Sequence, residues 1–513
     1  MRWPLAVVGL SVFWGLALTG LTVLPMHQDE PWIASTGAQL AQTGVYGSAM
    51  FAGYYGADQH YYLNMPAYAI VQAGVFRMLG VGVFQMRLVS VMAGLLVAAL
   101  TLAVARQLGG ESVSVVALGL LMVWRLAHST GTGLPLVDAA QLARYDVAVP
   151  VFTLAAVWVF DRADSVREYL LVGGLIGLAA LFNVYGGFVL PVLLVAWTRR
   201  HGRSGWRRAA PYLMLLGCAA MAVLWLAYAA AHWPEYVGQS RFHAAAYDVF
   251  NPQFYLNNLA REIERFGDLR PWQGSGVWLA AIALPIALVG LIAHARRHGN
   301  RLGLIAWLVV GQQALFGLLL AAKTPRYFVA VWPYAVIALA WLGVTVWRRW
   351  QAPIVRGGLV VCAAMLLIDG GGAIWQRRLA LASTTPYTAF IARVAELIPP
   401  NARVLGLHTY WLGLRQFDYH TWLVPLLLAD ARYVDAPLPF DAALAKINAN
   451  VILIDPAMRQ TFAAMARPGD VRRALFDRYQ AYLEQTQARL VGEVDDVTYG
   501  LMQVYVVQPS AWP

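Results

Sequence analysis

The chain has 513 residues, of which 59% are hydrophobic and only 13% are charged. Soluble domains carry about 25% charged residues, so the composition excludes an ordinary soluble enzyme and indicates a polytopic membrane protein. The formal net charge of +11 would also suit a nucleic-acid-binding protein. Because most arginines lie in short loops between apolar segments, membrane topology explains the basic charge better, and we expect no nucleic-acid partner.

Long apolar segments predict a mainly α-helical bundle of about eleven transmembrane helices. The expected spans are 4–24, 84–107, 112–128, 143–161, 166–182, 186–198, 209–231, 276–294, 303–322, 327–347 and 354–375. With a cytoplasmic N-terminus, arginine-rich connections such as 199–208 and 348–356 fall inside, as the positive-inside rule requires. Residues 166–198 could instead form a single long helix, which would invert everything after it. We expect two helices, because the stretch 183–187 reads Asn-Val-Tyr-Gly-Gly, a natural break.

The first outer connection, 25–83, is long enough to carry function. Two interfacial helices are expected within it, at 34–43 and 64–80. Asp29 and Glu30 stand at its start, where a charge is costly unless water, a partner or a substrate lies close by. A structural alternative is that Asp29 caps a helix beginning at Pro31. The outer loop 232–275 mixes aromatic and charged side chains, which suits a lid or a platform for a lipid-borne substrate.

The last part of the chain has a different character. We expect a transmembrane catalytic domain over 1–375 and a soluble extracytoplasmic α/β domain over 376–513. In the second domain the expected strands are 403–407, 450–454 and 501–507, and an amphipathic helix is expected at 470–488.

Further ionisable residues fall at the outer membrane level but come from separate segments. They are Asp58, His60, Arg144, Asp146, Lys323 and Arg326. Such residues mark functional sites by default. The structural alternative for the basic ones is that they reach the lipid headgroups, and for Arg144 with Asp146 that they form a local ion pair.

This set of residues suits the transfer of a sugar from a lipid phosphate to a hydroxyl group. The reaction needs a base for the acceptor proton and positive charge on the departing phosphate. Asp29 suits the base, with Glu30 beside it. The candidates for the phosphate are Arg144, Lys323, Arg326 and Tyr327, and the supporting residues are Asp146, Asp58 and His60. A divalent cation such as Mg²⁺ or Mn²⁺ could be held by Asp58, His60 and Glu30.

Several short motifs follow one another along the chain in a characteristic order. They are Asp29-Glu30-Pro31-Trp32-Ile33-Ala34 with Thr43-Gly44, Met65-Pro66-Ala67-Tyr68, Leu79-Gly80 with Met86-Arg87-Leu88, Arg144-Tyr145-Asp146, and Pro325-Arg326-Tyr327-Phe328 with Pro333. In this order the chain resembles the GT-C membrane glycosyltransferases, in the branch of the protein O-mannosyltransferases and the lipid A aminoarabinose transferase. It departs from their pattern at Met65-Pro66, where Pro-Pro is usual, and at 183–186, where a Lys-Gly pair is common.

The resemblance implies a polyprenyl-phosphate sugar donor, inversion at the anomeric carbon, and Asp29 as base or acceptor-positioning acid. The acceptor would be a lipid, glycan or protein at the outer side of the inner or plasma membrane, among membrane lipids. Two other classes of function remain open. One is a transporter or flippase of lipid-linked saccharides, although paired halves with broken helices are not evident in the sequence. The other is a non-catalytic scaffold of the cell envelope.

Overall fold

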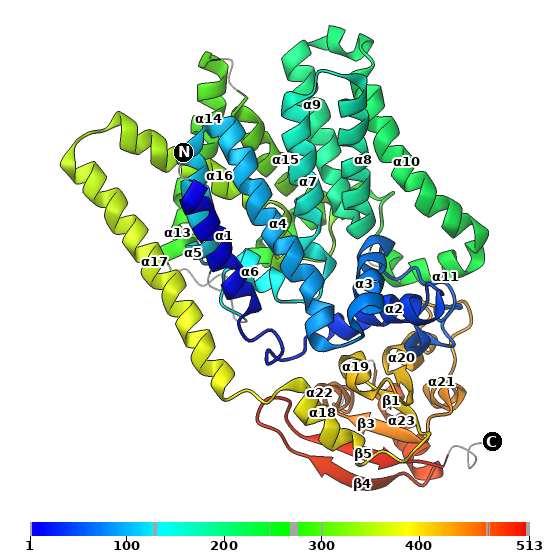
Figure 1. Cartoon of the computed structure of the whole chain (residues 1–513). Coiled ribbons are helices and arrows are strands. Elements are labelled where there is room, and N and C mark those ends of the chain that lie inside the picture. The colour runs from blue at the N-terminus through cyan, green and yellow to red at the C-terminus, as the bar shows by residue number, and fades with distance from the viewer. Residues whose placement is uncertain are drawn as a thin grey trace. The chain divides into compact units, whose positions relative to one another are not determined.

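The computed structural model describes residues 3–126, 131–245, 247–266, 275–298, 301–467, 470 and 472–508. The chain divides into two compact units, each assembled from three segments (Figure 1). The first unit comprises Met1–Thr19, Arg87–Ala227 and Tyr247–Leu379, and the second comprises Gly20–Met86, Tyr228–Ala246 and Ala380–Pro513.

The first unit is a bundle of helices. They are α1 (Trp3–Leu18), α4 (Val83–Gly109), α5 (Glu111–Val123), α6 (Pro135–Ala140), α7 (Val149–Arg162), α8 (Val166–Phe182), α9 (Val189–His201), α10 (Ala210–Ala231), α12 (Pro252–Ala260), α13 (Ser275–Trp278), α14 (Leu284–His298), α15 (Gly303–Leu319), α16 (Trp332–Arg349) and α17 (Pro353–Ala382), of which α4, α10 and α17 run on into the second unit. Short 3₁₀ turns include η2 (Tyr145–Val147), η3 (Val184–Phe188), η5 (Arg261–Phe266) and η8 (Pro325–Ala330). Helix α7 packs along α8, and Figure 1 shows α7, α8 and α9 side by side.

Helices occur at all the predicted spans, but their lengths differ. Within the described residues, four helices are long and apolar enough to cross a membrane: Val83–Gly109, Ala210–Ala231, Gly276–His298 and Pro353–Ala395. Three more apolar helices are shorter: Pro4–Leu18, Glu111–Val123 and Gly303–Leu319. The prediction of a mainly helical chain is therefore confirmed, whereas the number of eleven spans stays a prediction.

Residues 166–198 form two helices, as predicted. Helix α8 ends at Phe182, and η3 turns the chain before α9 begins. The turn folds tightly onto the end of α8, because a Cβ atom at Gly186 would lie 2.5 Å from the backbone of Ala179. Glycine is therefore required at this break.

The second unit is built on a five-stranded sheet. The strands are β1 (Arg403–Gly406), β2 (Asp418–Thr421), β3 (Val451–Ile454), β4 (Arg489–Val494) and β5 (Met502–Val506), in the order β2-β1-β3-β5-β4. Strand β1 runs parallel to β2 and β3, and β5 pairs antiparallel with β3 and β4. All four residues of β3 are buried, which explains its continuous apolar run. The three predicted strands are confirmed, and β2 and β4 are additions.

The helices of the second unit come from both ends of the chain. They are α2 (Asp29–Thr43), α3 (Pro66–Leu79), α11 (Trp233–Ala244), α18 (Tyr387–Ala395), α19 (Trp411–Leu414), α20 (Leu423–Leu428), α21 (Phe440–Ile447), α22 (Pro456–Met465) and α23 (Arg473–Gln485), with the 3₁₀ turns η1 (Ala49–Phe51) and η9 (His408–Tyr410). Helix α2 packs against α3, η9 and α19, while η1 packs against β2. The loop 25–83 thus shares a compact unit with the C-terminal sheet. The division at 375 and 376 into membrane and soluble domains stays a prediction.

Candidate functional site

The two neighbouring acids of the first loop have different environments. Helix α2 begins at Asp29 rather than at Pro31, and the residue before it makes no side-chain cap. The Glu30 side chain is fully buried, and its Oε2 accepts a hydrogen bond from the backbone N–H of His27 at 2.8 Å. The Asp29 side chain is 25% exposed, and its Oδ2 lies 3.7 Å from Nδ1 of His27. Glu30 therefore fixes the turn that leads into α2, whereas Asp29 keeps contact with solvent.

His60 has an acidic partner that the sequence did not indicate. Its Nδ1 lies 2.7 Å from Oε2 of Glu235 on α11, and its ring stacks on His232 with 3.5 Å between ring centroids. The backbone oxygen of Asp58 accepts a hydrogen bond from Gln39 at 2.6 Å. The contacts of His60 tie the first loop to α11 within the second unit, and the hydrogen bond of Asp58 ties the same loop to α2.

The side chains predicted to hold a cation do not gather around one point. Among the described residues, no group of three or more His, Cys, Asp or Glu side chains is placed to bind a metal ion. Asp58, His60 and Glu30 therefore do not form a cation site in this structure.

Arg144 and Asp146 form a buried ion pair in the first unit. The Arg144 Nε lies 2.7 Å from Oδ2 of Asp146, and the two side chains are 9% and 4% exposed. The hydroxyl of Tyr185 donates to the other carboxylate oxygen of Asp146 at 2.9 Å. Tyr185 also packs against the ring of Tyr327, with 5.1 Å between ring centroids. The predicted residues Arg144, Asp146 and Tyr327 are thus brought together through Tyr185.

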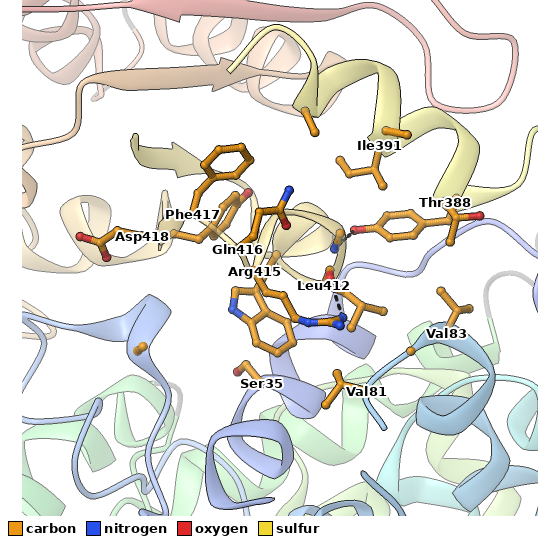
Figure 2. A pocket seen from close by; sticks show the side chains of 18 of the residues that line it. Ser35, Val81, Val83, Thr388, Ile391, Leu412, Arg415, Gln416, Phe417 and Asp418 are labelled. Atoms are coloured by element: carbon orange, nitrogen blue, oxygen red, sulfur yellow. Dashed lines mark hydrogen bonds between the residues drawn. The ribbon is translucent and has the colours of Figure 1, made fainter. Parts of the chain in front are cut away.

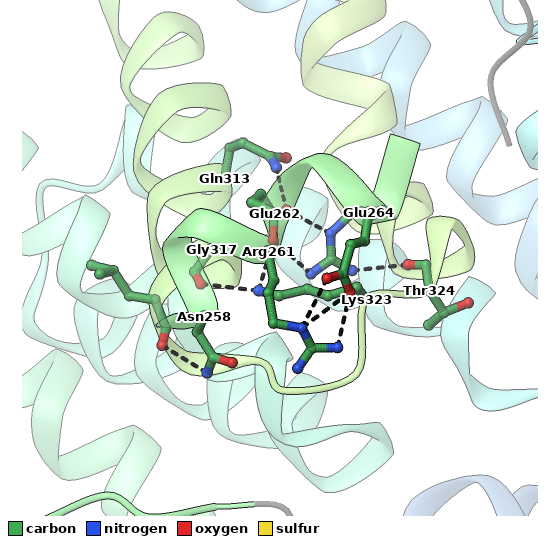
Figure 3. Close-up of polar contacts among 10 residues, drawn as sticks. Asn258, Arg261, Glu262, Glu264, Gln313, Gly317, Lys323 and Thr324 are labelled. Atoms are coloured by element: carbon green, nitrogen blue, oxygen red, sulfur yellow. Dashed lines mark hydrogen bonds and ion pairs between the residues drawn. The ribbon is translucent and has the colours of Figure 1, made fainter. Parts of the chain in front are cut away.

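Lys323 belongs to a second charged cluster, which is centred on Glu262 (Figure 3). The Lys323 Nζ lies 2.9 Å from Oε2 of Glu262, and the Arg265 Nε lies 2.6 Å from Oε1 of the same carboxylate. Gln313 donates a further hydrogen bond to Glu262 at 2.8 Å, and Arg265 donates to the carbonyl of Thr324 at 2.8 Å. Two cations share one carboxylate, so the cluster keeps an excess of positive charge.

The pKa values in this cluster follow from burial and pairing. Burial lowers the pKa of Lys323, against the opposing effect of Glu262. Burial would raise the pKa of Glu262, but the hydrogen bonds and charges of Arg265 and Lys323 hold it below its usual range. Glu262 is therefore ionised at neutral pH.

One aromatic side chain connects the two charged clusters of the first unit. The fully buried Phe316 packs against Tyr185 at 5.5 Å between ring centroids, and the Arg265 guanidinium lies 5.6 Å from the centroid of the Phe316 ring. Arg144 and Lys323 thus belong to one contiguous region of the first unit. Arg326 lies in η8, directly before Tyr327.

The partners that sequence reasoning missed are Tyr185, Glu235, Glu262 and Gln313. A weak signal existed for Glu262, because Glu262 and Arg265 are three residues apart and such a spacing favours an ion pair on a helical turn. The pairing with Lys323 gives no local signal, because the two residues belong to segments far apart in the chain.

Comparison with known proteins supports a fold rather than a sequence family. No protein-family model and no curated protein sequence matches the chain. Among solved structures, the chain is similar to ArnT from Cupriavidus metallidurans bound to undecaprenyl phosphate, with a TM-score of 0.63, 15% identity and 100% of both chains covered. The apo state of that protein gives a TM-score of 0.62 at 15% identity, covering 99% of this chain and 98% of that chain.

A second solved protein has a similar fold. The chain is similar to the oligosaccharyltransferase AglB from Archaeoglobus fulgidus in complex with an inhibitory peptide and a dolichol-phosphate, with a TM-score of 0.57 and 10% identity. This similarity covers 92% of this chain and 72% of that chain. ArnT is a lipid A aminoarabinose transferase, and both proteins are GT-C glycosyltransferases. The GT-C fold that the ordered motifs predicted is therefore confirmed.

Proposed function

We propose that this chain is an integral-membrane glycosyltransferase that moves a sugar from a polyprenyl-phosphate donor to an acceptor hydroxyl group. The observation that carries the proposal is the fold similarity over the full length of ArnT, whose crystal structure contains undecaprenyl phosphate. The sugar transferred is a hexose or pentose, the transfer inverts the anomeric carbon, and the acceptor lies outside the cytoplasm.

Asp29 is the proposed base. It stands at the first turn of α2 with a quarter of its side chain exposed, so it remains accessible to an acceptor. In the proposed step the acceptor hydroxyl gives its proton to the Asp29 carboxylate, and the acceptor oxygen bonds to the anomeric carbon. The bond from that carbon to the phosphate oxygen breaks, and its electron pair leaves with the polyprenyl phosphate.

The proposed donor-phosphate contacts lie in the first unit. Arg144 is a planar, permanently charged donor suited to a phosphate, although Asp146 already engages its Nε. Lys323 and Arg265 together outweigh the charge of Glu262, which leaves attraction for an anion. Tyr327 and Arg326 complete this set in η8.

The first experiment identifies the lipid bound to the purified protein by mass spectrometry and then measures transfer from a polyprenyl-phosphate sugar. We expect a polyprenyl phosphate to copurify, and Asp29→Asn to abolish transfer while leaving expression and thermal unfolding unchanged. The matched control is Asp477→Asn, an exposed aspartate of α23 whose partner is Arg473. Bound lipid without any transfer would favour a flippase, and the absence of both would favour a scaffold. Normal turnover of Asp29→Asn would remove Asp29 from the role of base.

The sidedness is tested by labelling single cysteines. Gln59 and Arg203 are both exposed, so each accepts a reporter cysteine in a background without Cys218 and Cys362. We expect an impermeant reagent to label the cysteine at Gln59 from outside the cell but not the one at Arg203. The reverse pattern would place the N-terminus outside.

A further inference from the structure

The second unit contains a large open cleft that none of the predicted site residues lines. Its volume is about 1130 Å³, at or above the upper end for small-molecule sites. Helix α2, the residues just before α4, helix α18 and the segment from α19 into β2 form its walls. Figure 2 shows Ser35 and Val81 on one side, with Thr388 and Ile391 on α18 and Arg415 and Gln416 after α19.

The wall of the cleft that α18 and α19 form is closely packed and therefore preformed. A Cβ atom at Gly413 would lie 2.4 Å from Cγ2 of Ile391, so α19 can approach α18 only because residue 413 is a glycine. The hydroxyl of Tyr387 accepts a hydrogen bond from the Gly413 backbone N–H at 3.2 Å and donates one to the carbonyl of Thr409 at 3.1 Å. These contacts hold the two helices in a fixed relation.

The lining of the cleft also includes polar side chains that make no hydrogen bond with the residues that the structure describes. In the described part of the chain, no hydrogen bond is made by the side chains of Gln42, Thr388, Glu396, Trp411 and Gln416. Trp411 is half-buried and Gln416 is exposed. A cleft lined by an indole ring together with amide, hydroxyl and carboxylate groups suits a ligand with apolar ring faces and many hydroxyl groups.

The charges of the cleft favour a neutral ligand. Arg415 and Glu396 bring one charge of each sign. The carboxylate of Asp418 is already paired with Nε of Arg403 at 2.6 Å, and Nε2 of His420 lies 3.1 Å from its other oxygen. The cleft therefore offers no excess of positive charge to a phosphate or an acidic polymer.

The sheet edge beside the cleft does not suit an extended peptide. Strand β2 is an edge strand, and a peptide that adds to a sheet needs such an edge to be open. Turn η1 packs against β2 and so restricts the room for a peptide beside this strand.

We propose that this cleft binds a neutral saccharide and that this saccharide is part of the acceptor, a role that rests on the function proposed above. Trp411 stacks on one face of a sugar ring. Gln416 and Gln42 hydrogen-bond its hydroxyl groups through both ends of their amides. Arg415 and Glu396 complete the polar wall. The cleft thereby positions an acceptor that carries carbohydrate, rather than a bare lipid or an unmodified peptide.

The test uses the full chain in lipid nanodiscs on an array of neutral oligosaccharides of three to five sugars, with phosphorylated glycans and peptides alongside. We expect at least one neutral oligosaccharide to bind. Titration with the best one should show affinity about tenfold lower or worse for Trp411→Ala. Gln416→Ala should also weaken binding. Because Gln416 is exposed, this variant should fold normally, so its loss of affinity would not be due to misfolding. The matched control Gln485→Ala changes an exposed glutamine of α23 outside the cleft and should bind normally.

Three outcomes would overturn the proposal: no neutral oligosaccharide binds, only phosphorylated glycans or peptides bind, or Trp411→Ala and Gln416→Ala bind as well as the parent chain. Mass spectrometry of the bound lipid in the same samples separates this result from the proposed function. If polyprenyl phosphate is bound and transfer occurs but no saccharide binds, the proposed saccharide site is refuted and the proposed enzyme activity is not. Saccharide binding that depends on Trp411, without lipid or transfer, would refute the proposed enzyme and leave the saccharide site standing.

Discussion

Replacing Glu262 with glutamine should destabilise the first unit far more than the same change at Glu264. Both acids lie in η5. Glu262 forms ion pairs with both Arg265 and Lys323, whose side chains are 0% and 3% exposed. Glu264 pairs with Arg261, and in that pair the side chains are 49% and 52% exposed. The two variants therefore compare a buried charge network with a surface ion pair in the same turn.

The size of the effect follows from the contacts that are lost. The Glu262 carboxylate accepts hydrogen bonds from Arg265, Gln313 and Lys323, at 2.6, 2.8 and 2.9 Å for the shortest from each. A glutamine has only one acceptor oxygen, and its amide N–H₂ would face other donors. Two cations would also lose the charge that compensates them. Breaking a buried pair in this way costs about 3–5 kcal/mol, whereas an exposed pair such as that of Glu264 contributes about 0–1 kcal/mol.

The assay is thermal unfolding of the purified variants in the same detergent, together with the yield of folded protein. We expect Glu262→Gln to lower the unfolding temperature by several degrees and Glu264→Gln to leave it almost unchanged. The pH dependence gives a second readout. The pKa of Glu262 is lower in the folded chain than its ordinary value, so the stabilisation is fully present above about pH 4.5 and is lost as the pH falls through the folded pKa. Equal unfolding temperatures for the two variants would refute the account of a buried charge network.

Two other expectations concern the second unit. Burial lowers the pKa of His408 to about 4, below its ordinary value, so the folded chain binds fewer protons than the unfolded chain between about pH 6.5 and pH 4. Stability should therefore fall as the pH is lowered through this window. In His408→Phe, which keeps a ring against Trp32, the unfolding temperature should depend less on pH. An unchanged pH dependence in this variant would exclude His408 as the cause. Gly413→Ala should lower the unfolding temperature, because the new Cβ would lie 2.4 Å from Cγ2 of Ile391, and a neutral effect would show that α18 and α19 can separate easily.

Local signals predicted the parts of the fold that depend on local sequence. The apolar run of β3 and the glycine-rich break after α8 both lie where periodicity and turn residues placed them. Strand β2 was not predicted, because its four residues, Asp-Tyr-His-Thr, show no apolar run, and neighbours bury the last three of them. Strand propensity gives little warning of such a case, since burial by other elements decides it.

Candidate site residues were predictable one at a time, but their partners were not. Arg144 and Asp146 are two residues apart, so an ion pair between them could be expected from the sequence, and it is present. The partner of Lys323 is Glu262, which the sequence analysis assigned to a lid or platform for substrate. Its position between two cations arises from tertiary structure that no short motif reports: α12, which leads into η5, packs against α15, and Gln313 of α15 donates a hydrogen bond to Glu262. The sequence therefore identified the charged residues, whereas only the tertiary structure shows which of them form ion pairs.

The contrast between Asp29 and Glu30 shows why adjacent acids need not share a role. Successive residues of an α-helix point about 100° apart, so a pair at the start of α2 cannot both face the same side. The buried Glu30 carboxylate accepts a hydrogen bond from the backbone N–H of His27, and this bond stabilises the turn before α2. Asp29 is partly exposed, and a base must be able to reach the acceptor hydroxyl. If Asp29 is the base, Glu30→Gln should lower the rate of transfer only in part, because an amide oxygen can still accept the hydrogen bond from His27 and keep the turn. A loss of transfer by Glu30→Gln as complete as that by Asp29→Asn would reverse these assignments.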